Sequence, residues 1–306
     1  MRAILFKVTV LCLAIFVFGA NYSPAEPEGK HSKLSLYNQI GGMTVLGLEH
    51  SPGQGAADTL ELRYRYYFSD SDSIVFRNNH IGFGATNTLS PATNSIGAFI
   101  EFEPIAILNV RLQYDYLTYF GEFVGMLEFE SPDEDYSART LDERADNDEA
   151  VWAVGHCYSV NPTFQIMLGR FVAVNRSSFM WYDIIDKDNY FYNPVSDTLM
   201  KHKEYFFSND AIVGFIPRKE SDDKLLIVGT RYAYSYVHST DRRRQQLGMV
   251  MVWMLGKKIW FMEKPRLTVA AMGYLEDQAP NGEEYRKDDL FVGGLFEFEH
   301  TLWSSE

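Results

Sequence analysis

The sequence contains few cysteines and few basic residues. Two cysteines occur among 306 residues, and Cys12 lies in an apolar N-terminal stretch. If that stretch is removed, Cys157 remains alone, which excludes an intramolecular disulfide and a cysteine-based zinc site. Only 28 Lys and Arg stand against 41 Asp and Glu, giving a formal net charge of -13. This balance argues against a nucleic-acid partner, because contacts to phosphates require basic side chains.

Long apolar runs are also scarce. After residue 20 no segment holds 18 consecutive apolar residues, so no transmembrane helix is expected. The apolar run from Val8 to Ala20 follows two basic residues and is too short to span a bilayer as a helix. It predicts a secretory signal peptide over 1–20, with cleavage between positions 19 and 25. The polar residues 21–36 are then expected to form a periplasmic N-terminal extension or a plug segment.

Aromatic residues, by contrast, are abundant, with 19 Tyr and 22 Phe. They fall in segments where apolar and polar residues alternate, which is the pattern of a β-strand exposed to two different environments. In 59–67 one face carries Leu60, Leu62, Tyr64 and Tyr66, and the other carries Glu61, Arg63 and Arg65. The same alternation recurs in three further clear segments, 107–116, 224–237 and 290–303.

Two all-β architectures produce such alternation. A soluble sandwich buries its apolar face, whereas a transmembrane barrel turns it outward and places aromatic residues at the ends of the apolar band. Several strands here end in aromatic clusters, such as 64–68 and 232–236, and the polar faces carry charges of both signs. The sequence therefore predicts an all-β protein, a transmembrane up-and-down antiparallel β-barrel.

About twelve strands fit within 37–303. Their expected spans are 38–50, 58–68, 73–87, 94–103, 105–120, 149–160, 163–176, 204–216, 224–238, 244–255, 265–276 and 288–303. Short and long connections then alternate, with long loops near 121–148 and 177–203, as in outer-membrane barrels. An even strand number places both termini on one side. Ten or fourteen strands are also compatible, because 122–130 and 178–185 could form or extend strands.

With its aromatic-rich final strand Leu295–Trp303 (LFEFEHTLW), its signal peptide and its aromatic bands, the chain resembles Gram-negative outer-membrane β-barrel proteins. Three residues follow the terminal aromatic, which departs from the usual ending of that class. The resemblance is at class level and indicates no particular family. It implies a location in the bacterial outer membrane with both termini periplasmic. It also implies contact with outer-membrane lipid and lipopolysaccharide, and with the barrel-assembly machinery.

The inward-facing charges are the main candidates for function. They could line the constriction of a porin-like channel for passive or facilitated diffusion of small polar solutes, or form a salt-bridge lattice that fills a narrow barrel. Arg63 and Arg65 are expected to approach Glu297 and Glu299, because closure brings the last strand beside the first. The full set of candidates is Glu61, Arg63, Arg65, Glu101, Glu103, Arg111, Asp115, Arg231, Glu297 and Glu299.

Two other functions are compatible with the sequence: a closed structural or surface-displaying barrel, and an outer-membrane enzyme that acts on lipid. No catalytic residues are identified, because the His-Ser pairs, such as His238-Ser239, are adjacent and would point to opposite faces of a strand. No metal site and no cofactor are expected. Arg242, Arg243 and Arg244 at a short turn are candidates for contact with lipopolysaccharide phosphates, since arginine binds phosphate in a bidentate manner.

Overall fold

The computed structural model describes residues 32–46, 54–68, 79–121, 125–185, 188–222, 224–278 and 289–305. The predicted signal peptide lies outside these residues, as does most of the predicted N-terminal extension. Strand β1 (Ser32–Leu46) begins before position 37, so the last part of that extension belongs to the barrel. Among the described residues, no helix combines the length and the apolar character needed to cross a membrane.

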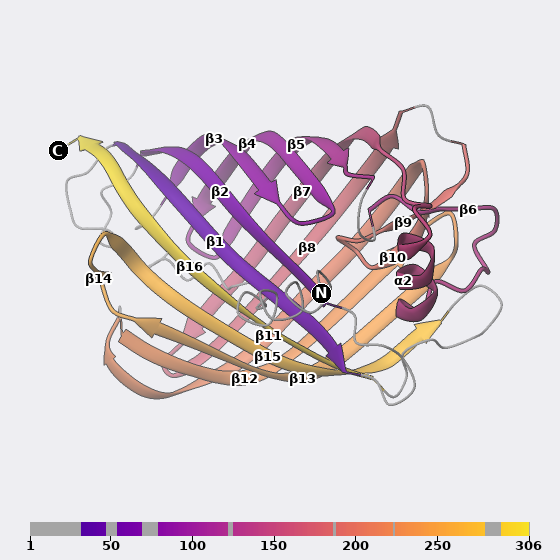
Figure 1. Cartoon of the computed structure of the whole chain (residues 1–306). Helices are drawn as coiled ribbons and strands as arrows, with labels where there is room; N and C mark the ends of the chain where they lie inside the picture. The colour runs from indigo at the N-terminus through magenta and orange to yellow at the C-terminus, as the bar shows by residue number, and fades with distance from the viewer. Residues whose placement is uncertain are drawn as a thin grey trace.

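Twelve long strands form one closed antiparallel barrel (Figure 1). Each strand pairs with its neighbour along the chain, and β16 pairs with β1 to close the ring. The predicted architecture and strand number are therefore confirmed. After β1, the strands are β2 (Gln54–Tyr67), β3 (His80–Leu89), β4 (Thr93–Ile105), β5 (Leu108–Tyr119), β7 (Ala153–Leu168), β8 (Phe171–Ile184), β11 (Lys203–Ser221), β12 (Lys224–Val237), β13 (Arg242–Leu255), β15 (Met262–Gln278) and β16 (Leu290–Ser305).

The two ends of the barrel differ. At one end the described connections are short: 106–107 between β4 and β5, and 169–170 between β7 and β8. The start of β1 and the end of β16 lie at this end too, because Ser32 pairs with Ser305. At the opposite end, residues 125–152 and 188–202 fold into a small unit that we call the cap (Figure 1).

The cap has its own secondary structure. It contains the helix α2 (Ala138–Asp146) and a three-stranded sheet of β6 (Glu128–Phe129), β9 (Tyr190–Asn193) and β10 (Thr198–Lys201). Ser137 caps the helix by accepting a hydrogen bond from the Thr140 amide, which is the usual role of serine at a helix start. A further short strand, β14 (Lys258–Ile259), pairs with β15 at the other end of the barrel.

One predicted hairpin is misplaced. A turn was expected at Asn161-Pro162, but both residues lie inside β7, and the turn falls at Gly169, where φ is +63°. Proline has no amide proton, so it signals a break in a ladder. Here Pro162 pairs with Val110 of β5, while the ladder to β8 is interrupted at 161–162. As a consequence β8 runs to Ile184, and the loop predicted from position 177 starts at 185.

Alternation along the strands separates the wall into an outer and an inner face. Outward side chains such as Leu60, Phe83 and Ile96 are about half exposed. Inward residues of β8, β11, β12, β13, β15 and β16 form an apolar cluster in which Ile216, Leu225 and other members are almost fully buried. The lumen is thus packed with apolar side chains along parts of these strands. Its inward-facing charges lie mainly on β1 to β5, and others lie on β11, β12, β15 and β16.

Candidate functional site

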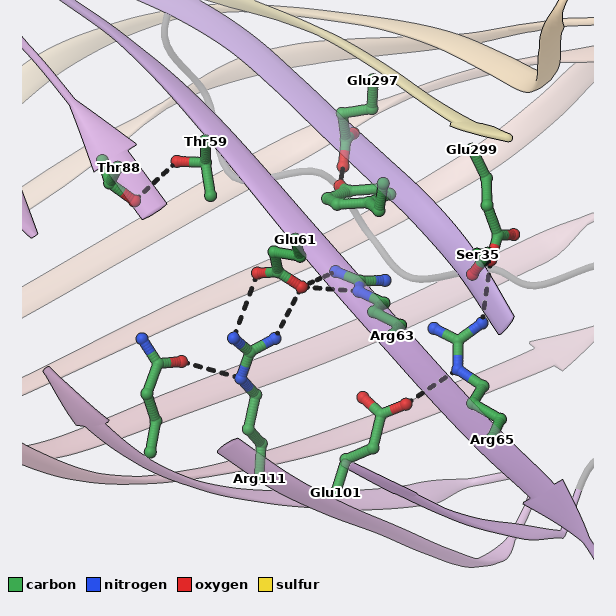
Figure 2. A network of polar contacts seen from close by, with 12 residues as sticks. Ser35, Thr59, Glu61, Arg63, Arg65, Thr88, Glu101, Arg111, Glu297 and Glu299 are labelled. Atoms are coloured by element: carbon green, nitrogen blue, oxygen red, sulfur yellow. Dashed lines mark hydrogen bonds and ion pairs between the residues drawn. The ribbon is translucent and has the colours of Figure 1, made fainter. Parts of the chain in front are cut away.

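The charged face of the lumen is built on β2, where Glu61, Arg63 and Arg65 all point inward (Figure 2). Glu61 accepts hydrogen bonds from Arg63 at 2.5 Å and from two nitrogens of Arg111 at 3.0 and 3.1 Å. Arg111 belongs to β5, and β3 and β4 separate it from β2 in the sheet. The bidentate pair therefore reaches across part of the lumen. Such charge-assisted pairs are the stronger class of hydrogen bond.

A second cluster surrounds Glu299 on β16. Its carboxylate lies 3.1 Å from Lys33 Nζ, 3.4 Å from Arg65 Nη1 and 2.5 Å from the Ser35 hydroxyl. Arg65 also donates to Glu101 at 2.8 Å. The predicted approach of Arg65 to Glu299 is therefore present in the structure. It joins three neighbouring strands, β2, β1 and β16, to β4.

Glu297 is held differently from the predicted direct contact with Arg63. Two nitrogens of Arg266 bind its carboxylate at 2.6 and 2.8 Å, and the Tyr37 hydroxyl donates to it. Arg63 stacks over the Tyr37 ring, 3.8 Å from its centroid. Arg63 and Glu297 are thus linked indirectly, because both of them contact Tyr37. A continuous series of contacts thus runs from β15 to β5 through Arg266, Glu297, Tyr37, Arg63, Glu61 and Arg111. We call this series, together with the neighbouring cluster of Lys33, Ser35, Arg65, His80, Glu101 and Glu299, the belt.

The other candidate residues also face inward and have partners. Arg231 binds Asp210 at 2.7 Å on the opposite part of the wall. Glu103 accepts from Asn109, and Asp115 accepts from Gln113 and Ser95. All ten predicted lumen residues are consequently inside the barrel, and each one contacts another polar side chain.

Burial shows that these charges have little access to water. Among the paired side chains of the belt, Arg111 is the most exposed at 17%, and the Glu297 side chain is 4% exposed. An aqueous channel would wet its lining. In this conformation the charges of the belt are instead buried and pair with one another.

Close packing of the belt depends on a glycine in β3. Gly82 faces inward, and a Cβ there would lie 2.7 Å from both Cγ and Oε1 of Glu101. The absent side chain lets the carboxylate of Glu101 reach both Arg65 and His80, 2.8 and 3.1 Å away.

Gly82→Val is expected to lower the unfolding free energy by about 1–3 kcal/mol, the usual cost of overpacking. Urea titration in detergent, followed by the heat-dependent shift in gel mobility, measures the change. Ala85→Val adds atoms to the outward face of the same strand and serves as the control, for which we expect almost no change. An equal loss of unfolding free energy in the two variants would show that the space between Gly82 and Glu101 does not limit the packing of the belt.

A second buried ion cluster fixes the cap to the barrel. Arg242 and Arg244 lie 3.1 and 3.0 Å from Asp277, whose side chain is fully buried. Arg244 also binds the side chain and the carbonyl of Asp197 in the cap. Arg242 lies over the ring of Tyr136, and burial raises the pKa of that phenol above its ordinary value. We call these residues the clamp.

The clamp revises the prediction for the three consecutive arginines. Arg242 and Arg244 point into the barrel and are buried, so they are not placed to contact lipid phosphates. Arg243 points outward, is exposed and pairs only loosely with Asp241, at 3.2 Å. Contact with lipopolysaccharide therefore remains a prediction for Arg243 alone.

The mouth of the barrel beneath the cap is apolar. Met126, Phe191 and Met200 of the cap are at most 1% exposed and pack against inward residues of the barrel, including Tyr182 and Phe206. The cap is consequently inserted into the mouth and is not merely laid over it.

Sequence reasoning missed several members of the belt and the clamp: Lys33, Tyr37, His80, Asp197, Arg266 and Asp277. It also missed Asp210, the partner of Arg231. Lys33 and Tyr37 were missed because β1 was expected to start later. The alternation of β15 would have placed Arg266 inward. In the described part of the chain, no group of three His, Cys, Asp or Glu could hold a metal ion.

No protein-family model matches the chain, and no curated protein sequence matches it. Solved structures are similar at low identity. The beta domain of the Bordetella autotransporter BrkA has 9% identity, a TM-score of 0.46, and coverage of 88% of this chain and 98% of its own. The KdgM porin in complex with oligogalacturonate has 6% identity and a TM-score of 0.40, with coverage of 87% of this chain and 99% of its own. The Pseudomonas putida toluene transporter TodX has 9% identity and a TM-score of 0.39, with coverage of 94% of this chain and 95% of its own. This chain is a closed twelve-stranded β-barrel that resembles outer-membrane barrel proteins at the level of class.

Proposed function

We propose that this protein is an outer-membrane barrel with a closed lumen that displays the cap at the cell surface. The observation that supports this most directly is the mutual saturation of the inward charges. Arg63 and Arg111 are both bound to Glu61, and Arg266 is bound to Glu297, so the strongest solute-binding groups are already occupied. The apolar packing of the cap against inward residues of the barrel supports a closed mouth as well.

The proposed orientation places the cap outside and both termini in the periplasm. Outer-membrane barrels have short periplasmic turns and longer extracellular connections. The short connections 106–107 and 169–170 lie at the end where β1 starts and β16 ends, and the folded cap lies at the other. The face that the cap would present is acidic. Its exposed carboxylates are Glu130, Asp133, Asp135, Asp142, Glu143, Asp146, Asp148, Glu149 and Asp188.

The porin-like channel predicted from the sequence is the alternative function. If the belt and the cap close the lumen as we propose, a channel would require both of them to move. The two functions make opposite predictions for ion flow, so conductance separates them.

In a planar bilayer, the refolded mature protein is expected to give no stable conductance steps. Ohmic steps that change in size or ion preference in Arg63→Ala would establish a channel and overturn the proposal. Leu62→Ala, on the outward face of the same strand, is the matched control. Display is tested separately by an epitope inserted after Asp146, at the end of α2. Antibody labelling of intact cells is expected, and labelling only after lysis would contradict the orientation.

A further inference from the structure

The outer wall of the barrel is not uniformly convex. A groove of about 860 Å³ crosses β4, β5, β7, β8, β11 and β12. It is lined mainly by outward-facing apolar and aromatic side chains, and the inward residues contribute to its floor. Prominent members of the lining are Ile100, Leu112, Tyr158, Phe179, Tyr205 and Phe207, most of which are about half exposed. The belt and the clamp play no part in this surface.

The groove follows the strand registers obliquely. At β4 and β5 it includes Ile100 and Leu112, which pair near the middle of their strands. At β11 it reaches Tyr205, two residues from the cap-side end of the strand. Tyr205 pairs with Trp181, which in turn pairs with Tyr158. The groove therefore runs from the middle of the wall toward the end that holds the cap.

Polarity changes along the groove in the same direction. Ile100 and Leu112 form its purely apolar part. Next comes a row of aromatic side chains, formed by Tyr114, Tyr158, Trp181 and Tyr205. In this row the Tyr114 hydroxyl lies 2.8 Å from Nδ1 of the neighbouring His156. Beyond it, Lys203 is mostly exposed and only 3.8 Å from Asp183. Aromatic and cationic side chains take these positions where hydrocarbon meets the polar layer of a membrane.

We propose that this groove holds an acyl chain of lipid A, with the sugar phosphates near Lys203. The inference rests on the proposed orientation, which places the cap side of the barrel in the outer leaflet. The groove opens on the outward face of the barrel wall, so lipid of the surrounding bilayer reaches it directly. Its mainly apolar lining matches a hydrocarbon chain, and Lys203, two residues beyond Tyr205 on the cap side, matches an anionic headgroup.

Native mass spectrometry of the full-length mature protein in mild detergent, titrated with purified lipid A, tests this proposal. We expect one retained lipid A on the parent protein. Val160→Trp fills the middle of the groove and should weaken retention about tenfold, a difference equivalent to 1.4 kcal/mol. Leu112→Trp fills it from the neighbouring strand, so the test survives if one variant folds poorly. Leu62→Trp adds the same ring to the outer wall elsewhere and should leave retention unchanged.

Equal retention by the parent and both groove variants would overturn the proposal. So would a parent protein that retains phosphatidylethanolamine in preference to lipid A. A dimer that Val160→Trp dissociates would identify a second copy of the chain as the occupant instead. None of these results depends on conductance or on antibody labelling, so failure of the lipid site is distinguishable from failure of the proposed function. A cap found on the periplasmic side would remove the reason for choosing lipid A.

Discussion

Glu61→Ala is expected to lower the unfolding free energy by about 3–5 kcal/mol, because removing one partner of a buried ion pair leaves an uncompensated charge. Here two guanidinium groups, those of Arg63 and Arg111, would lose their common acceptor. Both are largely shielded from water. Urea unfolding in detergent, followed by gel mobility and by circular dichroism, measures the change.

Two controls separate this effect from the loss of any surface ion pair. Glu220→Ala removes an exposed partner of Arg218, and exposed pairs contribute little, so we expect no measurable change. Adding Arg111→Met to Glu61→Ala removes one of the stranded charges and should restore part of the lost stability. A double variant that is as unstable as Glu61→Ala would show that the pairing of Glu61 with Arg111 is not the cause.

Asp277→Ala is expected to release the cap. The fully buried carboxylate faces Arg242 and Arg244, and its removal would leave both of them without their shared counter-ion. The expected cost is again about 3–5 kcal/mol, but it falls on the attachment of the cap and less on the barrel. Limited trypsin digestion should therefore cut at Arg139 and Arg144 much faster, while the barrel still shows heat-dependent gel mobility.

Asp241→Ala is the matched control for the clamp, because Asp241 pairs with the exposed Arg243 at the same turn. Its digestion should match that of the parent protein. If Asp277→Ala also digests at the parental rate, the apolar contacts of Met126, Phe191 and Met200 hold the cap without the clamp.

The sequence predicts which residues face the lumen far better than it predicts which of them touch. A period of two assigns every residue of a strand to a face, and this placed Glu61, Arg63 and Arg65 inward without knowledge of any partner. The pairing of Glu61 with Arg111 depends on the stagger between β2 and β5, and stagger is a property of the closed ring. The Tyr37 link between Arg63 and Glu297 depends on it in the same way.

Strand ends were predicted less well, for physical reasons that the residues show. Pro162 was interpreted as a turn, yet proline is tolerated in a strand where its missing amide proton leaves no ladder hydrogen bond unmade. Arg242 and Arg244 were expected at a solvated turn. They are buried because the cap folds back into the mouth, a tertiary contact that no local pattern encodes.

Closure of the barrel also constrains how the chain can fold. The contact between Ser35 and Glu299 joins residues 264 positions apart. One edge of β1 stays unpaired until β16, the last strand of the chain, pairs with it. Pairings so distant in sequence make folding slow, and an unpaired strand edge is a template for aggregation in the meantime. We therefore expect the pairing of β16 with β1 to form late, and the open edge of β1 to be exposed to aggregation until it does.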